Sequence, residues 1–284
     1  MAFVTRFAPS PTGPLHLGHA YSALLAHDMA RAAGGVFVLR IEDIDQTRCR
    51  PEWERHLTDD LEWLGVRWDG PVLRQSARHA RYGQALDLLW SRGLLYPCTC
   101  TRRDIDAALG APQEGSARVS GPDGAIYPGT CRTVRRSTLR PTDHHLRLDS
   151  AAALQTTDSP LWFTETGPAH RGSILTTPAD HAALIGDIIL ARKDFGTSYH
   201  LSVVIDDAAQ GVTHVVRGED LFDATRIHVL LQRLMGLPTP TYHHHRLIRD
   251  AAGKRLAKRD DARALSRYRA EGAGPKDIRR LVGL

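Results

Sequence analysis

Short apolar runs alternate with helical periodicities in the first third of the chain. The runs at 3–7 and 36–41 are continuous and rich in β-branched and large side chains, which is typical of parallel strands covered on both faces. Apolar residues recur at helical spacing over 19–33, 52–64 and 77–92, and a glycine follows each of these segments. This alternation predicts an α/β fold with a doubly wound, Rossmann-like parallel sheet.

The alternation lapses in the middle of the chain and then resumes. Residues 96–178 are rich in Pro, Gly, Ser and Thr, and we interpret them as a small insertion. Strands are predicted at 145–148, 161–164, 187–192, 212–217 and 242–249, and helices at 199–209, 222–235, 261–271 and 275–282. The predicted parts are a first half of the α/β domain at 1–95, an insertion subdomain at 96–180, a second half at 181–250, and a loop with short C-terminal helices at 251–284.

Length and composition indicate the class of protein. With 284 residues, 42% of them hydrophobic and 24% charged, the chain has the make-up of a soluble α/β domain with an insertion. Its apolar runs are too short to cross a bilayer, and residues 1–6 enter a strand pattern without the features of a signal peptide. We therefore expect a cytoplasmic protein without a membrane partner.

The net charge of +5 is concentrated near the end of the chain. Residues 254–284 contain ten Lys and Arg against four Asp and Glu, so the rest of the chain is close to neutral. A basic segment of this kind is expected for a protein that binds a polyanion such as tRNA. The alternative is a solvated helical face, which is common for an isolated run of charge.

The segment 9–19, PSPTGPLHLGH, separates the first predicted strand from the first predicted helix. A helix N-terminus offers unpaired N–H groups and a positive dipole end to a phosphate. Gly18 permits close approach of a nucleotide, and His16 and His19 lie on one helical face, where both imidazoles can donate to phosphate oxygens. The position at a strand-to-helix switch favours a nucleotide site over a structural histidine pair.

Four blocks, in order, resemble the glutamyl- and glutaminyl-tRNA synthetase family of class I aminoacyl-tRNA synthetases. RFAPSPTGPLHLGH at 6–19 resembles the HIGH signature, and RIEDID at 40–45 and VRGEDL at 216–221 resemble the next two blocks. KRLAKR at 254–259 resembles the KMSKS loop, with Ala257 where the family often has Ser. The likeness covers nearly the whole chain and implies a class I catalytic domain that uses ATP together with Mg²⁺.

Charged residues at predicted strand ends suggest a pocket for an amino acid, because ligands bind at strand ends in open α/β sheets. Arg6 and Arg217 suit the side-chain carboxylate of L-glutamate, since guanidinium pairs bidentately with carboxylate. Glu42 suits the α-ammonium; without the other blocks, Arg40 and Glu42 would be interpreted as a surface ion pair. The predicted glutamate-binding set, part of it implied by the resemblance, is Arg6, Phe7, Ala8, Pro9, Ser10, Glu42, Tyr199 and Arg217.

The segment 254–259 follows a turn that ends in Gly253, which is typical of a mobile loop that closes over phosphates. By resemblance, Lys258 stabilises the α-phosphate and the departing pyrophosphate, and with His16 and His19 it forms the predicted catalytic set. The predicted ATP-binding set is Pro9, Thr12, Gly13, His16, Gly18, His19, Arg255, Leu256, Ala257, Lys258 and Arg259.

Three of the four cysteines fall in the predicted insertion, and they are Cys98, Cys100 and Cys131. In a cytoplasmic chain such a cluster favours one structural zinc over a disulfide, and inert buried thiols are the alternative. Zinc prefers four ligands, so one position stays open. From chemistry alone we nominate His144 or His145. The resemblance implies instead a tyrosine four residues before the last cysteine, which is Tyr127.

Two other segments carry no predicted ligand. Residues 110–124 make the interval before Tyr127 longer than the family leads us to expect, which suggests an inserted loop. The run of three histidines at 243–245 lies on a predicted strand beside the nucleotide site, and we expect it to be structural or to face the nucleotide rather than to bind a metal.

The length of the chain favours one branch of the family. Only 26 residues follow Lys258, so we expect no helical anticodon-binding domain. The chain in this respect resembles the glutamyl-queuosine tRNA(Asp) synthetases. That resemblance implies a monomer that activates glutamate without tRNA and transfers it to the queuosine base in the anticodon stem-loop of tRNA(Asp). The alternatives are a truncated synthetase that charges the 3′ end of tRNA(Glu) and a non-catalytic paralogue that binds glutamate or tRNA.

Overall fold

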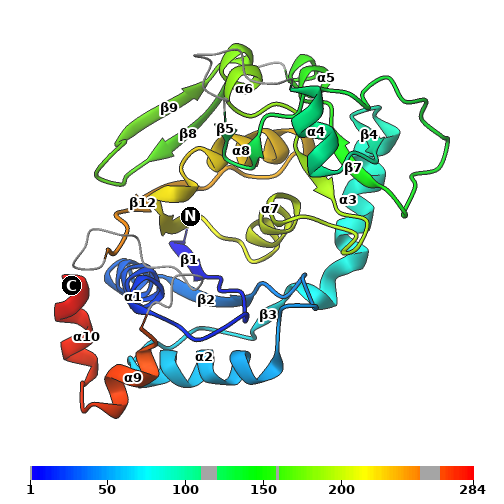
Figure 1. Cartoon of the computed structure of the whole chain (residues 1–284). Helices are drawn as coiled ribbons and strands as arrows, with labels where there is room; N and C mark the ends of the chain where they lie inside the picture. The colour runs from blue at the N-terminus through cyan, green and yellow to red at the C-terminus, as the bar shows by residue number, and fades with distance from the viewer. Residues whose placement is uncertain (1, 110–119, 158–159, 250–262) are drawn as a thin grey trace, which may run out of the picture.

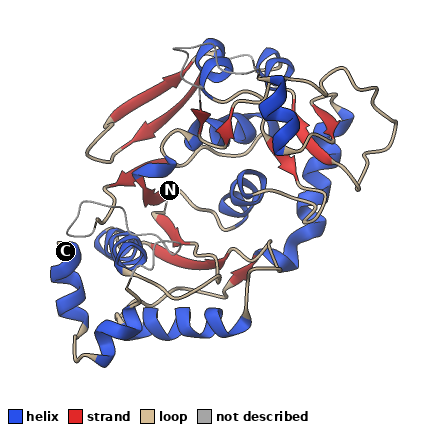
Figure 2. Ribbon diagram, viewed as in Figure 1, coloured by secondary structure: helices blue, strands red, loops and turns tan. Residues whose placement is uncertain are grey.

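A largely parallel sheet forms the centre of the molecule (Figures 1 and 2). The computed structural model describes residues 2–109, 120–157, 160–249 and 263–284. The central strands are β1 (Val4–Phe7), β2 (Val36–Ile41), β3 (Leu73–Arg74), β8 (Leu161–Glu165), β9 (Gly172–Thr176), β11 (His214–Gly218) and β12 (Thr241–His245). Strands β1, β2 and β3 pair in parallel, as do β11, β12 and β8, while β9 is antiparallel to β8.

The two sets of strands meet at β1 and β11. The Thr213 N–H donates to the Val4 carbonyl at 2.9 Å, which gives the order β3-β2-β1-β11-β12-β8-β9. The predicted doubly wound sheet is therefore confirmed, and β1 and β11 flank its switch point, outside which ligands bind in this class of fold. The predicted strand at 36–41 matches β2, whereas the strand predicted over 242–249 ends at His245.

Helices cover both faces of the sheet. They are α1 (Leu17–Ala32), α2 (Pro51–Trp63), α3 (His79–Ser91), α7 (Tyr199–Ala209), α8 (Ala224–Met235), α9 (Leu265–Ala270) and α10 (Pro275–Val282), with short 3₁₀ turns η1 (Gln75–Arg78) and η2 (Glu219–Leu221). On one face, α1, α2, α9 and α10 enclose a core with β1 and β2 that includes Leu24, Phe37, Leu61 and Ile278. The C-terminal helices thus complete a core that begins with the first strand.

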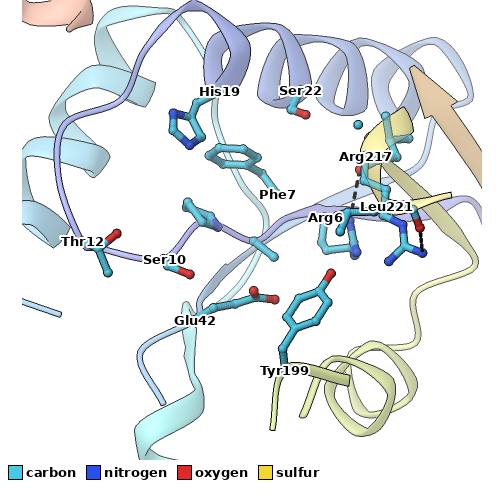
Figure 3. Close-up of a pocket in the computed structure, with 14 residues that line it drawn as sticks. Arg6, Phe7, Ser10, Thr12, His19, Ser22, Glu42, Tyr199, Arg217 and Leu221 are labelled. Carbon is cyan, nitrogen blue, oxygen red and sulfur yellow. Dashed lines mark hydrogen bonds between the residues drawn. The ribbon is translucent and has the colours of Figure 1, made fainter. Parts of the chain in front are cut away.

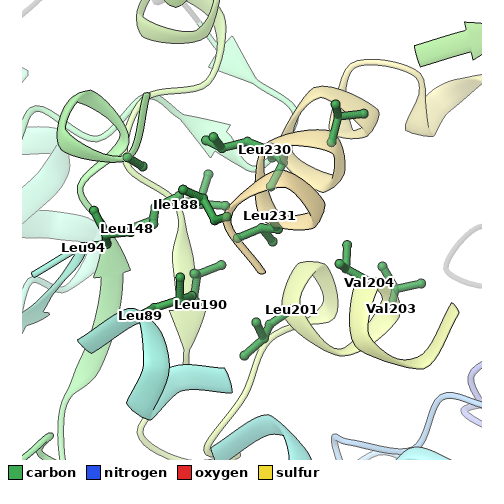
Figure 4. Close-up of a cluster of buried hydrophobic side chains, with 14 of the residues drawn as sticks. Leu89, Leu94, Leu148, Ile188, Leu190, Leu201, Val203, Val204, Leu230 and Leu231 are labelled. Carbon is green, nitrogen blue, oxygen red and sulfur yellow. The ribbon is translucent and has the colours of Figure 1, made fainter. Parts of the chain in front are cut away.

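A second core lies on the other face, where α3, α7 and α8 pack together (Figure 4). Leu89, Leu201 and Leu230 contribute from the three helices, and all are fully buried. Leu148 and Leu190 reach the same core from outside the central sheet. This shared core ties the insertion to the α/β domain, so the insertion is held by apolar packing on one side.

The insertion contains a small antiparallel sheet of β4 (Leu95–Cys98), β7 (His145–Leu148) and β10 (Ile189–Ala191), in the order β10-β7-β4. Its other elements are α4 (Arg102–Ala108), β5 (Ser120–Gly121), β6 (Gly124–Ala125), α5 (Ser150–Gln155) and α6 (Pro178–Leu184). Strand pairing crosses the predicted boundary at 180 in both directions, because β8 and β9 join the central sheet and β10 joins the small one. The division of the chain at 95, 180 and 250 stays a prediction.

Across the described ranges, every helix is too short or too polar to span a membrane.

Candidate active site

A cavity of about 530 Å³ opens at the carboxyl ends of β1, β2 and β11 (Figure 3). We call it the crevice. Its lining residues are Arg6, Phe7, Ala8, Pro9, Ser10, Thr12, His19, Ser22, Glu42, Tyr199, Val216, Arg217, Gly218 and Leu221. All eight residues of the predicted glutamate set are among them. They meet because Arg6, Glu42 and Arg217 come at or directly after the ends of neighbouring parallel strands.

The buried carboxylate of Asp207 neutralises Arg6. Its Nε donates to Asp207 Oδ1 at 3.0 Å, and Arg40 Nη1 donates to the same oxygen at 2.6 Å. Arg40 also pairs with Glu42 at 3.2 Å. The alternative interpretation of Arg40 and Glu42 as a surface ion pair is wrong in one respect. The pair exists, but it is buried: the Arg40 side chain is 0% exposed and that of Glu42 is 10% exposed.

Burial and charge act in opposite directions on the two carboxylates. For Asp207, burial favours the neutral acid, but Arg40 and Arg6 outweigh it and lower the pKa below its ordinary value. For Glu42, burial dominates and raises the pKa although Arg40 and Arg6 oppose it. Burial likewise raises the pKa of Tyr199, which begins α7 with its hydroxyl toward Arg6 (Figure 3). The crevice therefore favours ligands that bring a positive group to Glu42.

Arg217 has different surroundings. Its Nε donates to His244 Nε2 and its Nη1 to His228 Nδ1, both at 3.1 Å. Its Nη2 donates to the Leu221 carbonyl at 3.2 Å and to Thr225 Oγ1 at 2.6 Å. The residues that fix this guanidinium come from η2, α8 and β12, so three elements orient it toward the crevice.

The three histidines of the run on β12 have different partners. His244 contacts Arg217, while the His245 ring bonds to Ser22, which lines the crevice. His243 Nδ1 lies 3.0 Å from Thr166 Oγ1 on the other side of the strand. The structure thus gives His244 and His245 contacts to crevice residues.

Helix α1 begins at Leu17, two residues before the predicted start, because His16 is its N-cap. The Gly18 N–H donates to His16 Nδ1 at 3.1 Å, and the His16 N–H donates to His19 Nδ1 at 3.2 Å. Each neutral ring therefore carries its proton on Nε2. A side chain on Gly18 would come within 3.0 Å of the His16 ring, which is a second reason for glycine there.

The predicted ATP set divides into three groups. Pro9, Thr12 and His19 line the crevice, whereas Gly13, His16 and Gly18 do not. The third group, which lies outside the described residues, is Arg255, Leu256, Ala257, Lys258 and Arg259. The chain that follows this segment returns to the histidine motif, since Ala264 bridges to His16 and the Leu265 N–H donates to the Leu15 carbonyl at 2.8 Å.

The three cysteines of the insertion come together, with their sulfur atoms within 4.8 Å of one another. We call Cys98, Cys100, Cys131 and Tyr127 the cysteine cluster. The Tyr127 hydroxyl lies 3.5 Å from Cys98 Sγ and 3.3 Å from Cys100 Sγ. Burial alone would raise the pKa of Cys131, but hydrogen bonds from the Tyr127 hydroxyl and the Thr99 N–H lower that pKa to about 7. Thiolate is the form that binds metals.

Other contacts distinguish the candidates for a fourth ligand. His144 pairs with Asp143 at 2.7 Å, and His145 Nδ1 accepts from the Lys193 N–H at 3.2 Å, so both rings have partners outside the cluster. Arg147 Nε donates to Cys98 Sγ at 3.3 Å, and its guanidinium stacks 3.8 Å from the centre of the Tyr127 ring. Three thiols, a phenol and a neighbouring cation suit a zinc ion, whose thiolate ligands need a counter-charge.

Comparison with known proteins agrees with this geometry. Residues 2–284 match the sequence model of the family described as tRNA synthetases class I (E and Q), catalytic domain. The chain belongs to this family. Class I synthetases are ligases that use ATP.

Two similar relatives carry the name glutamyl-Q tRNA(Asp) synthetase. The chain is 65% identical to the glutamyl-Q tRNA(Asp) synthetase of Rhodobacter capsulatus, covering 99% of this chain and 100% of that protein. It is 39% identical to the protein of that name from Geobacter sulfurreducens, covering 93% of this chain and 77% of the other.

Solved structures of synthetases share the fold. A glutamate tRNA ligase from Elizabethkingia meningosepticum, in complex with its amino acid, superposes with a TM-score of 0.77 at 28% identity; the match covers 100% of this chain. The chain spans 61% of that ligase. Mycobacterium tuberculosis methionyl-tRNA synthetase with methionyl-adenylate shares the fold alone, with a TM-score of 0.65 at 12% identity over 99% of this chain and 64% of that one.

Sequence reasoning missed three residues that support the arginines of this synthetase crevice, which are Asp207, His228 and Glu165, and it did not separate His244 from the other two histidines of its run. One signal was available for Asp207: Arg6 and Arg40 lie in strands predicted to be covered on both faces, where an arginine requires a carboxylate, and the helix predicted at 199–209 contains two aspartates. No signal singled out Glu165, because its role depends on how β8 and β12 pair.

Proposed function

We propose that this synthetase activates L-glutamate with ATP to form glutamyl-adenylate without tRNA, and then transfers glutamate to the queuosine base in the anticodon of tRNA(Asp). One observation carries the first step: Arg6, Glu42 and Arg217 line a single cavity at the switch point, and helix α1 begins beside it. The second step is supported by the names of the relatives.

The charges of the crevice match those of glutamate. In the proposed pose, Glu42 accepts from the α-ammonium, while Arg217 donates to the side-chain carboxylate with help from Arg6 and the Tyr199 hydroxyl. The α-carboxylate then faces the beginning of α1, where His19 lines the cavity. A neutral amino acid would leave Arg217 without a counter-charge, so the pocket favours an acidic substrate.

Activation needs negative charge to be stabilised on phosphate. An oxygen of the α-carboxylate attacks the α-phosphorus of ATP, and the bond to the pyrophosphate oxygen breaks. The Nε2–H groups of His16 and His19 are neutral donors at the start of α1, and Lys258 supplies a positive charge in our proposal. Such donors act mainly on the charge that develops in the transition state. Mg²⁺ bound together with ATP would neutralise part of that charge.

The cysteine cluster would hold one zinc ion through Cys98, Cys100, Tyr127 and Cys131. Four protein ligands leave no open position for a substrate, which is typical of a structural zinc site rather than a catalytic one. The cluster also joins the end of β4 to the loop that carries Tyr127 and Cys131.

A second candidate function has one specific observation in its favour. The solved structures that cover this chain include glutamate tRNA ligases, so a synthetase that charges the 3′ end of tRNA(Glu) remains the rival. A non-catalytic paralogue is disfavoured, because the chain keeps the pair His16 and His19 at the start of α1, where His19 lines the crevice. We propose a cytoplasmic monomer.

Two assays test the proposal. ATP–pyrophosphate exchange that depends on glutamate and proceeds without tRNA is expected, and its absence would contradict the activation step. Radiolabelled glutamate is then supplied with tRNA(Asp), with its anticodon stem-loop with and without queuosine, and with tRNA(Glu), and the labelled nucleotide is identified after digestion. Label on the queuosine-containing loop is expected. Equal labelling of both loops, or label only at the 3′ end of tRNA(Glu), would overturn the second step.

A further inference from the structure

Arg217 is held entirely by neutral groups within the described part of the chain. Its four hydrogen-bond partners are two imidazole nitrogens, the Leu221 carbonyl and the Thr225 hydroxyl. A guanidinium has five N–H donors, so one N–H on Nη1 has no acceptor among the described residues. Arg6, by contrast, bonds directly to the Asp207 carboxylate. The two arginines of the crevice therefore differ in how much positive charge they keep.

The arginine determines the protonation of His244. A guanidinium only donates, so His244 Nε2 must present its lone pair to Arg217, and the ring proton must be on Nδ1. That nitrogen bonds to Glu165 Oε2. Both partners are buried, with side chains 1% and 0% exposed. The carboxylate thus accepts the only proton of the ring and excludes the other tautomer.

The second oxygen of Glu165 is also occupied. Oε1 accepts from the His244 N–H at 2.9 Å and from the Gly167 N–H at 2.6 Å. Gly167 has no room for a side chain, since an added Cβ would lie 2.7 Å from this oxygen and against the His244 carbonyl. The backbone therefore fixes which carboxylate oxygen faces the imidazole.

His228 holds the other side of Arg217 by the same logic. Its Nδ1 accepts from Arg217, so its proton is on Nε2, which lies 3.1 Å from His200 Nδ1. Burial lowers the pKa of His228 well below its ordinary value, and burial also lowers that of His244. Both rings are therefore neutral around neutrality, and neither adds a positive charge beside Arg217.

We propose that Glu165 and His244 are positioning residues for Arg217: the buried carboxylate holds the imidazole in the tautomer that accepts from the arginine. The arginine is oriented without a carboxylate in direct contact, so its charge is kept for the substrate. This inference rests on the proposed function, in which Arg217 binds the side-chain carboxylate of glutamate. A carboxylate bonded directly to Arg217 would compete with that of the substrate.

Glu165→Gln tests the proposal, because it keeps the shape and reverses one hydrogen bond. The amide oxygen must take the position that accepts from two backbone N–H groups, so the amide NH₂ faces His244 Nδ1. The ring then carries its proton on Nε2, so it no longer accepts from Arg217 Nε and can donate only to Thr225 Oγ1, 3.1 Å away. We expect the KM for glutamate in ATP–pyrophosphate exchange to rise about tenfold, the worth of one hydrogen bond to a charged group, with the KM for ATP and kcat unchanged.

A second measurement reads the tautomer directly. ¹⁵N NMR of the histidine rings is expected to place the His244 proton on Nδ1 in the wild-type protein and on Nε2 in Glu165→Gln. Asp187→Asn is the matched control, because Asp187 is an equally buried carboxylate whose partners, Tyr96 and Arg132, lie outside the crevice. It should lower the melting temperature and leave the KM for glutamate unchanged.

The results that would contradict the inference differ from those that would contradict the proposed function. An unchanged KM for glutamate in Glu165→Gln, or an equal rise in both KM values, would overturn the inference. If that variant does not fold, the wild-type spectrum decides, since a proton on Nε2 or a doubly protonated ring would overturn it too. Absence of exchange in the wild-type protein would instead refute the proposed function, whatever the tautomer of His244.

Discussion

In the crevice, charged side chains surround a cavity of about 530 Å³, and their protein partners lie behind them. In the cysteine cluster, by contrast, three thiols and a phenol contact one another, and the nearest charge is one guanidinium. The crevice exposes charged groups that a substrate can pair with and then leave. In our proposal the cluster supplies all four donors of a metal site from the protein itself. The comparison therefore predicts chemistry in the first region and a contribution to stability from the second.

Loss of zinc is the largest expected effect. Metal analysis should find one zinc per chain, and Cys131→Ser should abolish it and lower the melting temperature, because structural zinc contributes folding free energy. Cys49→Ser is the control, since Cys49 lies outside the cluster. The stability role would be contradicted if the metal-free wild-type protein had the melting temperature of the zinc-bound protein. A variant that loses zinc and keeps full stability would contradict it too.

Removal of His19 should mainly reduce turnover. We expect His19→Ala to lower kcat in ATP–pyrophosphate exchange by about 100-fold or more, with little change in the KM for glutamate, because the missing donor acts on charge that develops at phosphorus. Lys258→Ala should behave alike. His27→Ala on the same helix is the control, since its ring packs on Phe37 away from the crevice. Near-normal turnover of His19→Ala would contradict the assignment.

Removal of Arg217 should mainly affect glutamate. Arg217→Ala should weaken glutamate binding by about 1.5–3 kcal/mol, the worth of a hydrogen bond to a charged group, and leave the KM for ATP unchanged. Arg226→Ala, which removes an arginine on α8 that bonds to Thr176 outside the crevice, is the control. A parallel loss of affinity for ATP would make Arg217 a residue of the fold instead.

The smallest expected effect concerns the C-terminal helices. The residues predicted to bind tRNA phosphates are Arg263, Arg267, Arg269, Lys276, Arg279 and Arg280. Three of them pair within the protein, Arg263 with Glu271, Arg279 with Asp28 and Arg280 with Asp277. Arg267→Gln with Lys276→Gln is therefore the sharper variant.

The double variant should reduce the dependence of tRNA binding on salt concentration by about two units of slope at most, because each substitution leaves one phosphate without its cation. Glutamate-dependent exchange without tRNA should be unchanged, and it serves as the internal control. An unchanged slope would remove α9 and α10 from the nucleic-acid surface.

Local sequence pattern was sufficient to predict the strands and helices and the strand-end residues that line the crevice. The strand at 36–41 and the helices at 199–209 and 275–282 were predicted to the residue, because a continuous apolar run and helical spacing are local signals. Arg6, Glu42 and Arg217 were predicted as one site because the carboxyl ends of parallel strands meet at one edge.

The residues that contact the crevice arginines and histidines from elsewhere in the chain could not be predicted from local pattern. Asp207 lies 201 positions from Arg6, and Glu165 lies 79 positions from His244. In the run of histidines, the alternation of strand side chains decides that His244 and not His243 meets Arg217, and the register of β12 is set only when it pairs with β11 and β8.

The sequence by itself thus determined the order of strands and helices, the strand-end charges and the cysteine spacing, since each of these depends on neighbours in the chain. Only the tertiary structure decided which carboxylate neutralises an arginine and which tautomer a buried imidazole takes. The physical reason is that hydrogen bonds and charge interactions act over a few ångströms in space. Those distances exist only after β1 has met β11 and β12 has met β8.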